Sequence, residues 1–305
     1  MAKRLEVRFH SAGVQCSAWL YLPEGGPAPV IVMAHGLGGV RGMRLDAYAE
    51  RFCDAGYACL AFDYRHFGDS DGQSRQLLDI ELQLDDWAAA IAYARSLTTV
   101  DGSRVVLWGT SFGGGHVIVA AARDRNIAAV VSQCPFTDGP ASVLAMSPWT
   151  SAKATAVALR DVIGARLGHS PVMIATSGPP GSTALMAAPD ALPGYLALVP
   201  ASTTTFSNQV AARIALKITT HIPGRNTADV DCPILFCVCE TDSVAPAKAT
   251  LRHARKAPRG EVKLYPEGHF DIYVGDAFER VVADQIRFLS THVPLTRTDP
   301  KELSA

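Results

Sequence analysis

The fold is decided by one stretch of the sequence, Val105-Val106-Leu107-Trp108-Gly109-Thr110-Ser111-Phe112-Gly113-Gly114-Gly115. It begins as an apolar run typical of a buried strand and continues into a helical pattern over 112–123. Between the two lies a G-x-S-x-G motif centred on Ser111. A sharp strand-to-helix turn strains the backbone of such a serine, and the glycines two positions before and after it relieve the crowding. We therefore expect Ser111 to project from the sheet at a helix N-terminus, where the helix dipole favours negative charge.

A second glycine-rich motif, His35-Gly36-Leu37-Gly38-Gly39, follows the apolar run 30–34. Glycines allow the backbone to turn inward there, so the N–H of Leu37 can pair with the N–H of Phe112 as an oxyanion hole. A plain strand-to-loop turn is the alternative interpretation. The spacing fits neither the phosphate-binding G-x-x-x-x-G-K-[ST] loop nor the dinucleotide-binding G-x-G-x-x-G fingerprint.

An acid and a histidine complete the pattern further along the chain. Asp242 follows the apolar run 233–239, and His269 follows the predicted strand 262–265. Open α/β sheets gather their active sites at the carboxyl ends of strands, so both side chains are expected near Ser111. His269 would act as general base, and Asp242 would orient it. An isolated aspartate or histidine in a turn is more often structural, so the prediction depends on four motifs occurring in one order.

The rest of the chain alternates short apolar runs with amphipathic stretches. This alternation predicts an α/β fold with a mostly parallel, doubly wound sheet. The expected strands are 30–34, 57–62, 104–108, 127–132 and 233–239, and the expected helices are 44–55, 79–96, 112–123, 247–256 and 277–291. The segments 4–9 and 15–22 predict an antiparallel pair at the edge of that sheet.

The region 135–229 breaks this alternation, because it holds several Pro-Gly breakers and no clear strand. We interpret it as a mainly helical cap inserted between two parts of the core, 1–134 and 230–294, with a polar tail at 295–305. Few residues of the insertion are charged, which favours an apolar substrate pocket. The predicted lining residues are Phe136, Met146, Trp149 and Phe206, although core packing would explain such side chains equally well.

Composition excludes several classes of function. Of the 305 residues 48% are hydrophobic, and 28 Lys+Arg against 29 Asp+Glu leave a net charge of −1, which argues against nucleic-acid binding. No window resembles a membrane span, and the charged start of the chain does not resemble a signal peptide, so a cytoplasmic location is expected. The seven cysteines are scattered through apolar runs, which favours reduced thiols. No metal or cofactor site is predicted, since Cys237-Val238-Cys239 has no second pair at zinc-site spacing.

On these four motifs the chain resembles the α/β-hydrolase fold superfamily, over nearly its whole length apart from the insertion. The loop 63–72 also resembles a structural loop of that superfamily, with His66 in place of the usual first glycine. The resemblance is closest to the branch that holds dienelactone hydrolases, prolyl oligopeptidases and serine aminopeptidases. The acid motif has Cys239 where the superfamily usually has glycine, and Glu240 is a minor rival to Asp242.

The resemblance implies a serine hydrolase that cleaves an ester or thioester of a small, largely apolar molecule through an acyl-enzyme, without a cofactor. Acyl transfer, C–C bond cleavage and peptide hydrolysis use the same residues and stay open, as does a non-catalytic binding protein. An aminopeptidase needs an anion for the substrate's ammonium group, and the insertion's few acids, among them Asp138, Asp161 and Asp190, offer only a thin choice. The apolar cap could also form a homodimer interface.

Overall fold

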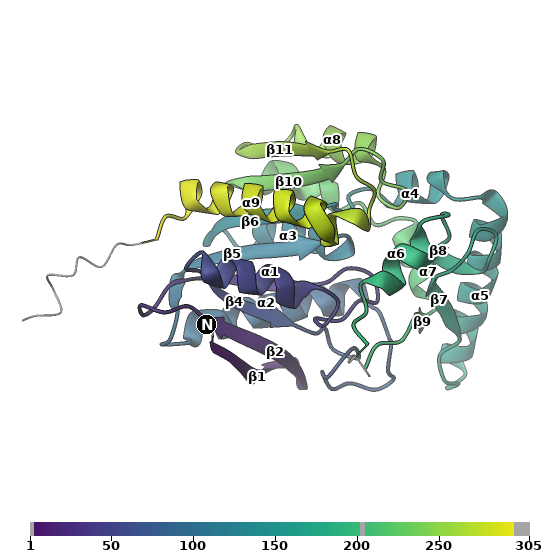
Figure 1. The fold of residues 1–305 in the computed structure, drawn as a ribbon. Helices are drawn as coiled ribbons and strands as arrows, with labels where there is room; N and C mark the ends of the chain where they lie inside the picture. Colours follow the sequence, from purple (N-terminus) through teal and green to yellow (C-terminus); the bar gives the residue numbers. More distant parts are fainter. Residues whose placement is uncertain (1–2, 202–204, 296–305) are drawn as a thin grey trace, which may run out of the picture.

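The computed structural model describes residues 3–201 and 205–295, and it has an eight-stranded sheet between two layers of helices (Figure 1). The strand order is β1-β2-β4-β3-β5-β6-β10-β11. The strands are β1 Lys3–Ser11, β2 Val14–Leu22, β3 Pro29–Ala34, β4 Ala58–Phe62, β5 Asp101–Thr110, β6 Ile127–Gln133, β10 Ile234–Cys239 and β11 Gly260–Tyr265. The polar tail expected at 295–305 lies outside the described residues from 296 onward.

The six strands from β4 to β11 pair in parallel, whereas β2 pairs antiparallel with both β1 and β4. Every residue of β3, β4 and β10 is buried, as expected for parallel strands that are covered on both faces. The predicted doubly wound sheet with an antiparallel N-terminal pair is therefore confirmed.

Helices cover both faces of the sheet (Figure 1). Helices α1 (Leu45–Asp54) and α9 (Gly275–His292) pack on one face. Helices α2 (Ile80–Ser96), α3 (Phe112–Arg123) and α8 (Ala247–Ala254) pack on the other. The five helices lie within two or three residues of the bounds that their apolar periodicity predicts.

The chain between β6 and β10 forms a separate group of elements beside one end of the main sheet (Figure 1). Its helices are α4 Gly139–Ala145, α5 Pro148–Arg166, α6 Ala191–Ala197, α7 Ile214–Ile218 and the 3₁₀ helix η1 Pro223–Asp229. The region also holds a sheet ordered β8-β7-β9, from Ala184–Met186, Met173–Ser177 and Gln209–Ala211. The expectation of no clear strand here is wrong, because strands of three to five residues are too short to show alternation.

The loop after β4 is held by a buried carboxylate. Asp63 accepts hydrogen bonds from the backbone N–H groups of Arg41 (2.7 Å) and Asp69 (3.2 Å), and burial raises its pKa to about 6 despite the nearby Arg41 guanidinium. His66 has φ 70°, a left-handed conformation that glycine adopts more readily. This explains why the resembling loops carry glycine at that position.

A second buried carboxylate ties the insertion together. Asp161 of α5 is fully buried and accepts hydrogen bonds from the backbone N–H groups of Val172 (2.7 Å) and Arg213 (2.8 Å). The Arg213 guanidinium also donates to it at 2.7 and 2.9 Å. Four donors therefore balance the cost of burying this charge.

We expect Asp161→Asn to destabilise the protein by about 3 kcal/mol, because it leaves buried donors without a charged acceptor. Urea unfolding followed by circular dichroism measures the change. Asp229→Asn, at an exposed position, is the matched control. Equal stability of the two variants would contradict this role of Asp161.

Candidate active site

Ser111 lies at the turn between β5 and α3 and has φ 56° and ψ −118°. Its N–H donates to the carbonyl of Gln133 (2.9 Å), and its own carbonyl accepts from the N–H of Phe136 (2.8 Å). A Cβ atom on Gly109 would lie 2.2 Å from the carbonyl oxygen of Gly113, so this turn requires glycine. The backbone thus holds Ser111 in a sparsely populated conformation that costs about 1–3 kcal/mol.

The structure brings Ser111, His269 and Asp242 together. His269 Nε2 lies 2.9 Å from Ser111 Oγ, and His269 Nδ1 lies 2.7 Å from Asp242 Oδ2. A carboxylate only accepts, so Nδ1 carries the proton and Nε2 is free to take one from the serine. Asp242 Oδ1 accepts from the N–H groups of Val244 (2.8 Å) and Ala245 (2.6 Å), which fixes the carboxylate.

The His269 and Asp242 side chains are each 2% exposed, so water scarcely screens the interaction between them. Glu240, the rival acid, is exposed, and within the described residues no hydrogen bond joins its side chain to His269.

His35 shapes the loop that faces Ser111. Its Nδ1 accepts from the N–H of Gly36 (2.7 Å), and its Nε2 donates to the carbonyl of Met43 (3.0 Å). Burial lowers the pKa of His35 to about 4, which keeps this hydrogen-bonded neutral form at neutral pH. A Cβ on Gly36 would lie 2.7 Å from Ser111 Cβ, so only glycine lets the loop approach this closely.

Leu37 and Phe112 are the two residues whose N–H groups the sequence names as oxyanion donors. Both residues line the same cavity as Ser111, and within the described residues neither N–H donates a backbone hydrogen bond outside the regular elements. Phe112 is the first residue of α3, where helical N–H groups lack internal partners. Both residues therefore border the cavity that Ser111 lines.

Several residues that hold the segments around Ser111 in place could not be identified from the sequence. Tyr195 of α6 donates its hydroxyl hydrogen to the carbonyl of Leu37 (2.9 Å). The hydroxyls of Tyr273 and Thr110 are also hydrogen-bonded to each other behind Ser111. In the sequence, such a tyrosine cannot be distinguished from an ordinary core residue, because its partner lies far away in the chain.

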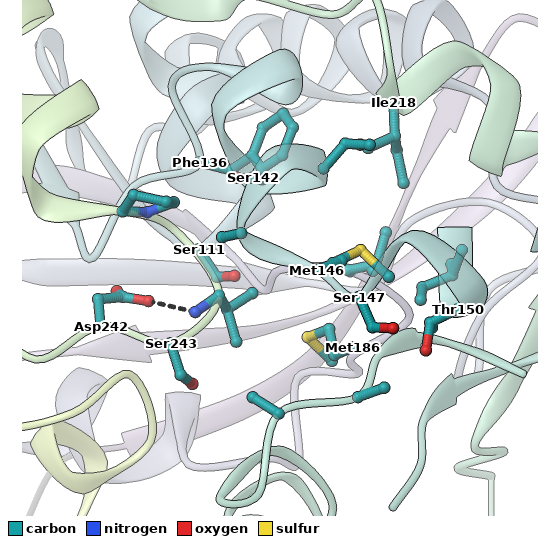
Figure 2. A pocket seen from close by; sticks show the side chains of 18 of the residues that line it. Ser111, Phe136, Ser142, Met146, Ser147, Thr150, Met186, Ile218, Asp242 and Ser243 are labelled. Carbon is teal, nitrogen blue, oxygen red and sulfur yellow. Dashed lines mark hydrogen bonds between the residues drawn. The ribbon is translucent and has the colours of Figure 1, made fainter. Parts of the chain in front are cut away.

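A cavity of about 530 Å³ opens beside Ser111 (Figure 2). Ser111 and Asp242 lie toward one end of it, whereas Ser147 and Thr150 lie toward the other. Most lining side chains are apolar and come from the insertion, including Val143, Met146, Met186 and Ile218. Among the described lining residues Asp242 is the only ionisable one.

Two of the four predicted lining residues border this cavity and two do not. Phe136 and Met146 line it. Trp149 and Phe206 do not: Trp149 is 78% exposed on the outer side of α5, and the Phe206 ring packs 5.7 Å from Tyr195. Composition alone does not indicate which side of a helix or loop faces a cavity, so these two residues were misplaced.

Three acids of the insertion already have hydrogen-bond or ion-pair partners. Asp138 binds Arg252 and His253, and Asp161 binds Arg213. Asp190 accepts from the Ser243 hydroxyl (2.9 Å) and does not line the cavity. The described lining therefore offers no anion besides Asp242 for a substrate ammonium group.

A buried histidine packs against the ring of Phe112. His116 is fully buried, with its ring centroid 4.9 Å from that of Phe112 and its Nε2 2.9 Å from Gln83 Oε1. Burial, together with the neighbouring His221, lowers the pKa of His116 to about 3. The unfolded chain binds a proton here below about pH 6.5 and the folded chain does not, so stability falls as the pH drops from that value.

We expect His116→Gln to reduce this acid sensitivity. Between pH 6.5 and about pH 4, the free energy of unfolding should fall by about 3 kcal/mol less in the variant than in the wild type. Urea titrations across this range measure the difference, and His169→Gln, at an exposed position, is the control. Parallel pH profiles for His116→Gln and the wild type would refute the assignment.

Comparisons with known proteins agree with this fold. The sequence model of the family described as "Serine aminopeptidase, S33" matches residues 25–274. The quorum-quenching protein AidA of Acinetobacter baumannii is 61% identical over 292 residues, which cover 95% of this chain and 96% of AidA. The thiohydrolase aneE of Aspergillus aculeatus is 26% identical over 295 residues, which cover 93% of this chain and 92% of aneE.

One solved structure extends the comparison to three dimensions. The α/β hydrolase GrgF from Penicillium superposes with a TM-score of 0.79 at 23% identity, covering 95% of this chain and 99% of GrgF. This likeness concerns the fold, which is the one that the four motifs predict.

Proposed function

Because the chain belongs to the serine aminopeptidase S33 family of α/β-hydrolases, we propose that it is a serine hydrolase for a carboxylic ester or thioester of a small, largely apolar molecule. The observation that carries this proposal is the hydrogen-bonded series from Ser111 through His269 to Asp242. A serine hydroxyl is a weak nucleophile unless an adjacent base removes its proton, and His269 Nε2 is within reach to do so.

The geometry supports a two-step reaction. Ser111 Oγ attacks the carbonyl carbon while its proton moves to His269 Nε2, and the Leu37 and Phe112 N–H groups stabilise the oxyanion. The C–O or C–S bond then breaks, and His269 returns the proton to the leaving alcohol or thiol. Water, deprotonated by His269, attacks the acyl-enzyme, releases the acid and regenerates Ser111.

The cavity favours an apolar acyl group. Its lining is mostly apolar, and a volume of about 530 Å³ suits a small molecule. We assign residues 135–229 as the cap that encloses it, between core parts 1–134 and 230–294. The names of AidA and aneE, a quorum-quenching protein and a thiohydrolase, are compatible with a small ester or thioester substrate.

Peptide hydrolysis is less well supported, despite the name of the family. Among the described lining residues only Asp242 is acidic, and its carboxylate is already bound to His269 and two backbone N–H groups. Acyl transfer would use the same acyl-enzyme, with an alcohol or amine in place of water.

Labelling with a fluorophosphonate, followed by peptide mass mapping, tests the nucleophile. We expect one label on Ser111, and we expect Ser111→Ala to lose both the label and at least roughly 10³-fold of its ester turnover. Ser142→Ala removes another cavity hydroxyl and is the control that should keep both. A label retained by Ser111→Ala would contradict the proposed nucleophile.

The same preparation distinguishes hydrolysis from transfer. We expect p-nitrophenyl esters and matched thioesters to yield the free acid, with turnover peaking at an intermediate acyl length. If an added alcohol captured nearly all of the acyl group, the reaction would be transfer. Labelling of Ser111 without turnover of either substrate class would contradict the ester and thioester assignment.

Enlarging the cavity should change the preferred acyl length. Ile218→Ala removes lining methyl and methylene groups, each worth about 0.8 kcal/mol of contact, so short esters should lose about tenfold in kcat/KM relative to long ones. Ile163→Ala makes the same change at a position that is 56% exposed. An unchanged length profile for Ile218→Ala would show that the acyl group binds elsewhere.

A further inference from the structure

Helix α5 has the reverse of the usual distribution of apolar side chains. Its buried residues include the small Ala154 and Ala158, whereas Leu159, Ile163 and the C-cap residue Leu167 are 49%, 56% and 67% exposed. At its N-terminal end Trp149 is 78% exposed. A surface helix normally turns its large apolar residues toward the core, so this outer face is unpartnered.

The exposed apolar residues share one side of the helix. They are spaced three or four residues apart, which keeps them in line on an α-helix. This apolar stripe consists of Trp149, Ala152, Ala156, Leu159, Ile163 and Leu167. Helix α5 lies at the outer edge of the insertion (Figure 1), and every residue of the stripe is exposed.

Along helix α5 itself, whose residues are all described, only positive charges border the stripe. At 100° per residue, Lys153 and Arg160 fall along one side of it and Arg166 along the other, and all three are exposed. Within α5, which the structure describes in full, the single acid is Asp161, and it is fully buried against Arg213. The exposed face is therefore apolar in the middle and basic at both margins.

The stripe begins at the rim of the cavity. Val143, Met146 and Ser147 line the cavity. Leu144 and Trp149, in the same stretch of chain, are 86% and 78% exposed. If the exposed Trp149 contacts another surface, an apolar molecule that leaves this surface has only a short path to the cavity.

We propose that the apolar stripe and its basic margins bind the surface of a membrane that contains anionic phospholipids. A helix with exposed tryptophan and leucine and with lysine and arginine at its margins lies in the interface plane of a bilayer, where its basic side chains meet anionic headgroups. A second copy of the chain fits less well, because a two-fold contact would set the same positive charges against one another.

Vesicle sedimentation with the full chain tests this proposal. We expect binding to vesicles of phosphatidylcholine and phosphatidylglycerol, much weaker binding to phosphatidylcholine alone, and weakening by salt. Arg160→Glu/Arg166→Glu should lower the partition coefficient by more than about tenfold. Arg255→Glu/Arg259→Glu makes the same charge change on exposed residues between α8 and β11 and should bind like the wild type.

The apolar part of the stripe is tested separately. Leu159→Ser/Ile163→Ser should also reduce binding more than about tenfold, whereas Leu264→Ser, at a position that is 50% exposed on β11, should not. Vesicles should shift the tryptophan emission of the wild type to the blue, and Trp149→Phe should abolish this shift.

Three outcomes would overturn the proposal. The first is the absence of sedimentation with anionic vesicles. The second is an equal loss of binding in the two double-arginine variants, which would indicate a general charge attraction. The third is a concentration-dependent dimer, seen by sedimentation velocity, that Leu159→Ser/Ile163→Ser abolishes, because the stripe would then be an interface between two copies. All three measurements are independent of catalytic activity.

Discussion

The left-handed backbone conformation of Ser111 is the constraint on which the rest of the site depends. With φ at 56°, the serine projects from the end of β5 instead of continuing either the strand or the helix. Such a conformation persists only where its surroundings hold it. Here Gln133 and Phe136 bind the serine's own peptide groups, and the close approach of Gly36 fills the space beside its Cβ.

The parallel sheet assembles the remaining groups around this turn. The loops after β3, β5, β10 and β11 carry Leu37, Ser111, Asp242 and His269, and parallel strands bring all four loops to one edge. Burial then fixes protonation states: His35 is kept neutral, and the carboxylate of Asp242 keeps the proton of His269 on Nδ1. The insertion adds the cavity wall and, through Tyr195, one hydrogen bond to the loop at Leu37.

The sequence predicted the parts of this arrangement that depend on local chemistry. The motif at Ser111 and the loop holding Asp242 follow strands with long apolar runs, and the loop holding His269 follows a shorter, mostly exposed strand, so their convergence followed from the fold class. The short strands of the insertion have no such signal, and neither do Tyr195 and Tyr273, whose contacts join segments far apart in the chain. Trp149 was placed in the cavity only because it lies in the insertion, whereas α5 turns it outward.

The most direct measurement is rapid-quench intact-mass analysis during turnover of a p-nitrophenyl ester. If Ser111 is the nucleophile, about one equivalent of p-nitrophenol should appear in a burst, and the protein should gain the mass of the acyl group on the peptide that contains Ser111. Hydrolysis without any acylated protein, or with the acyl group on another residue, would contradict a covalent mechanism at this serine.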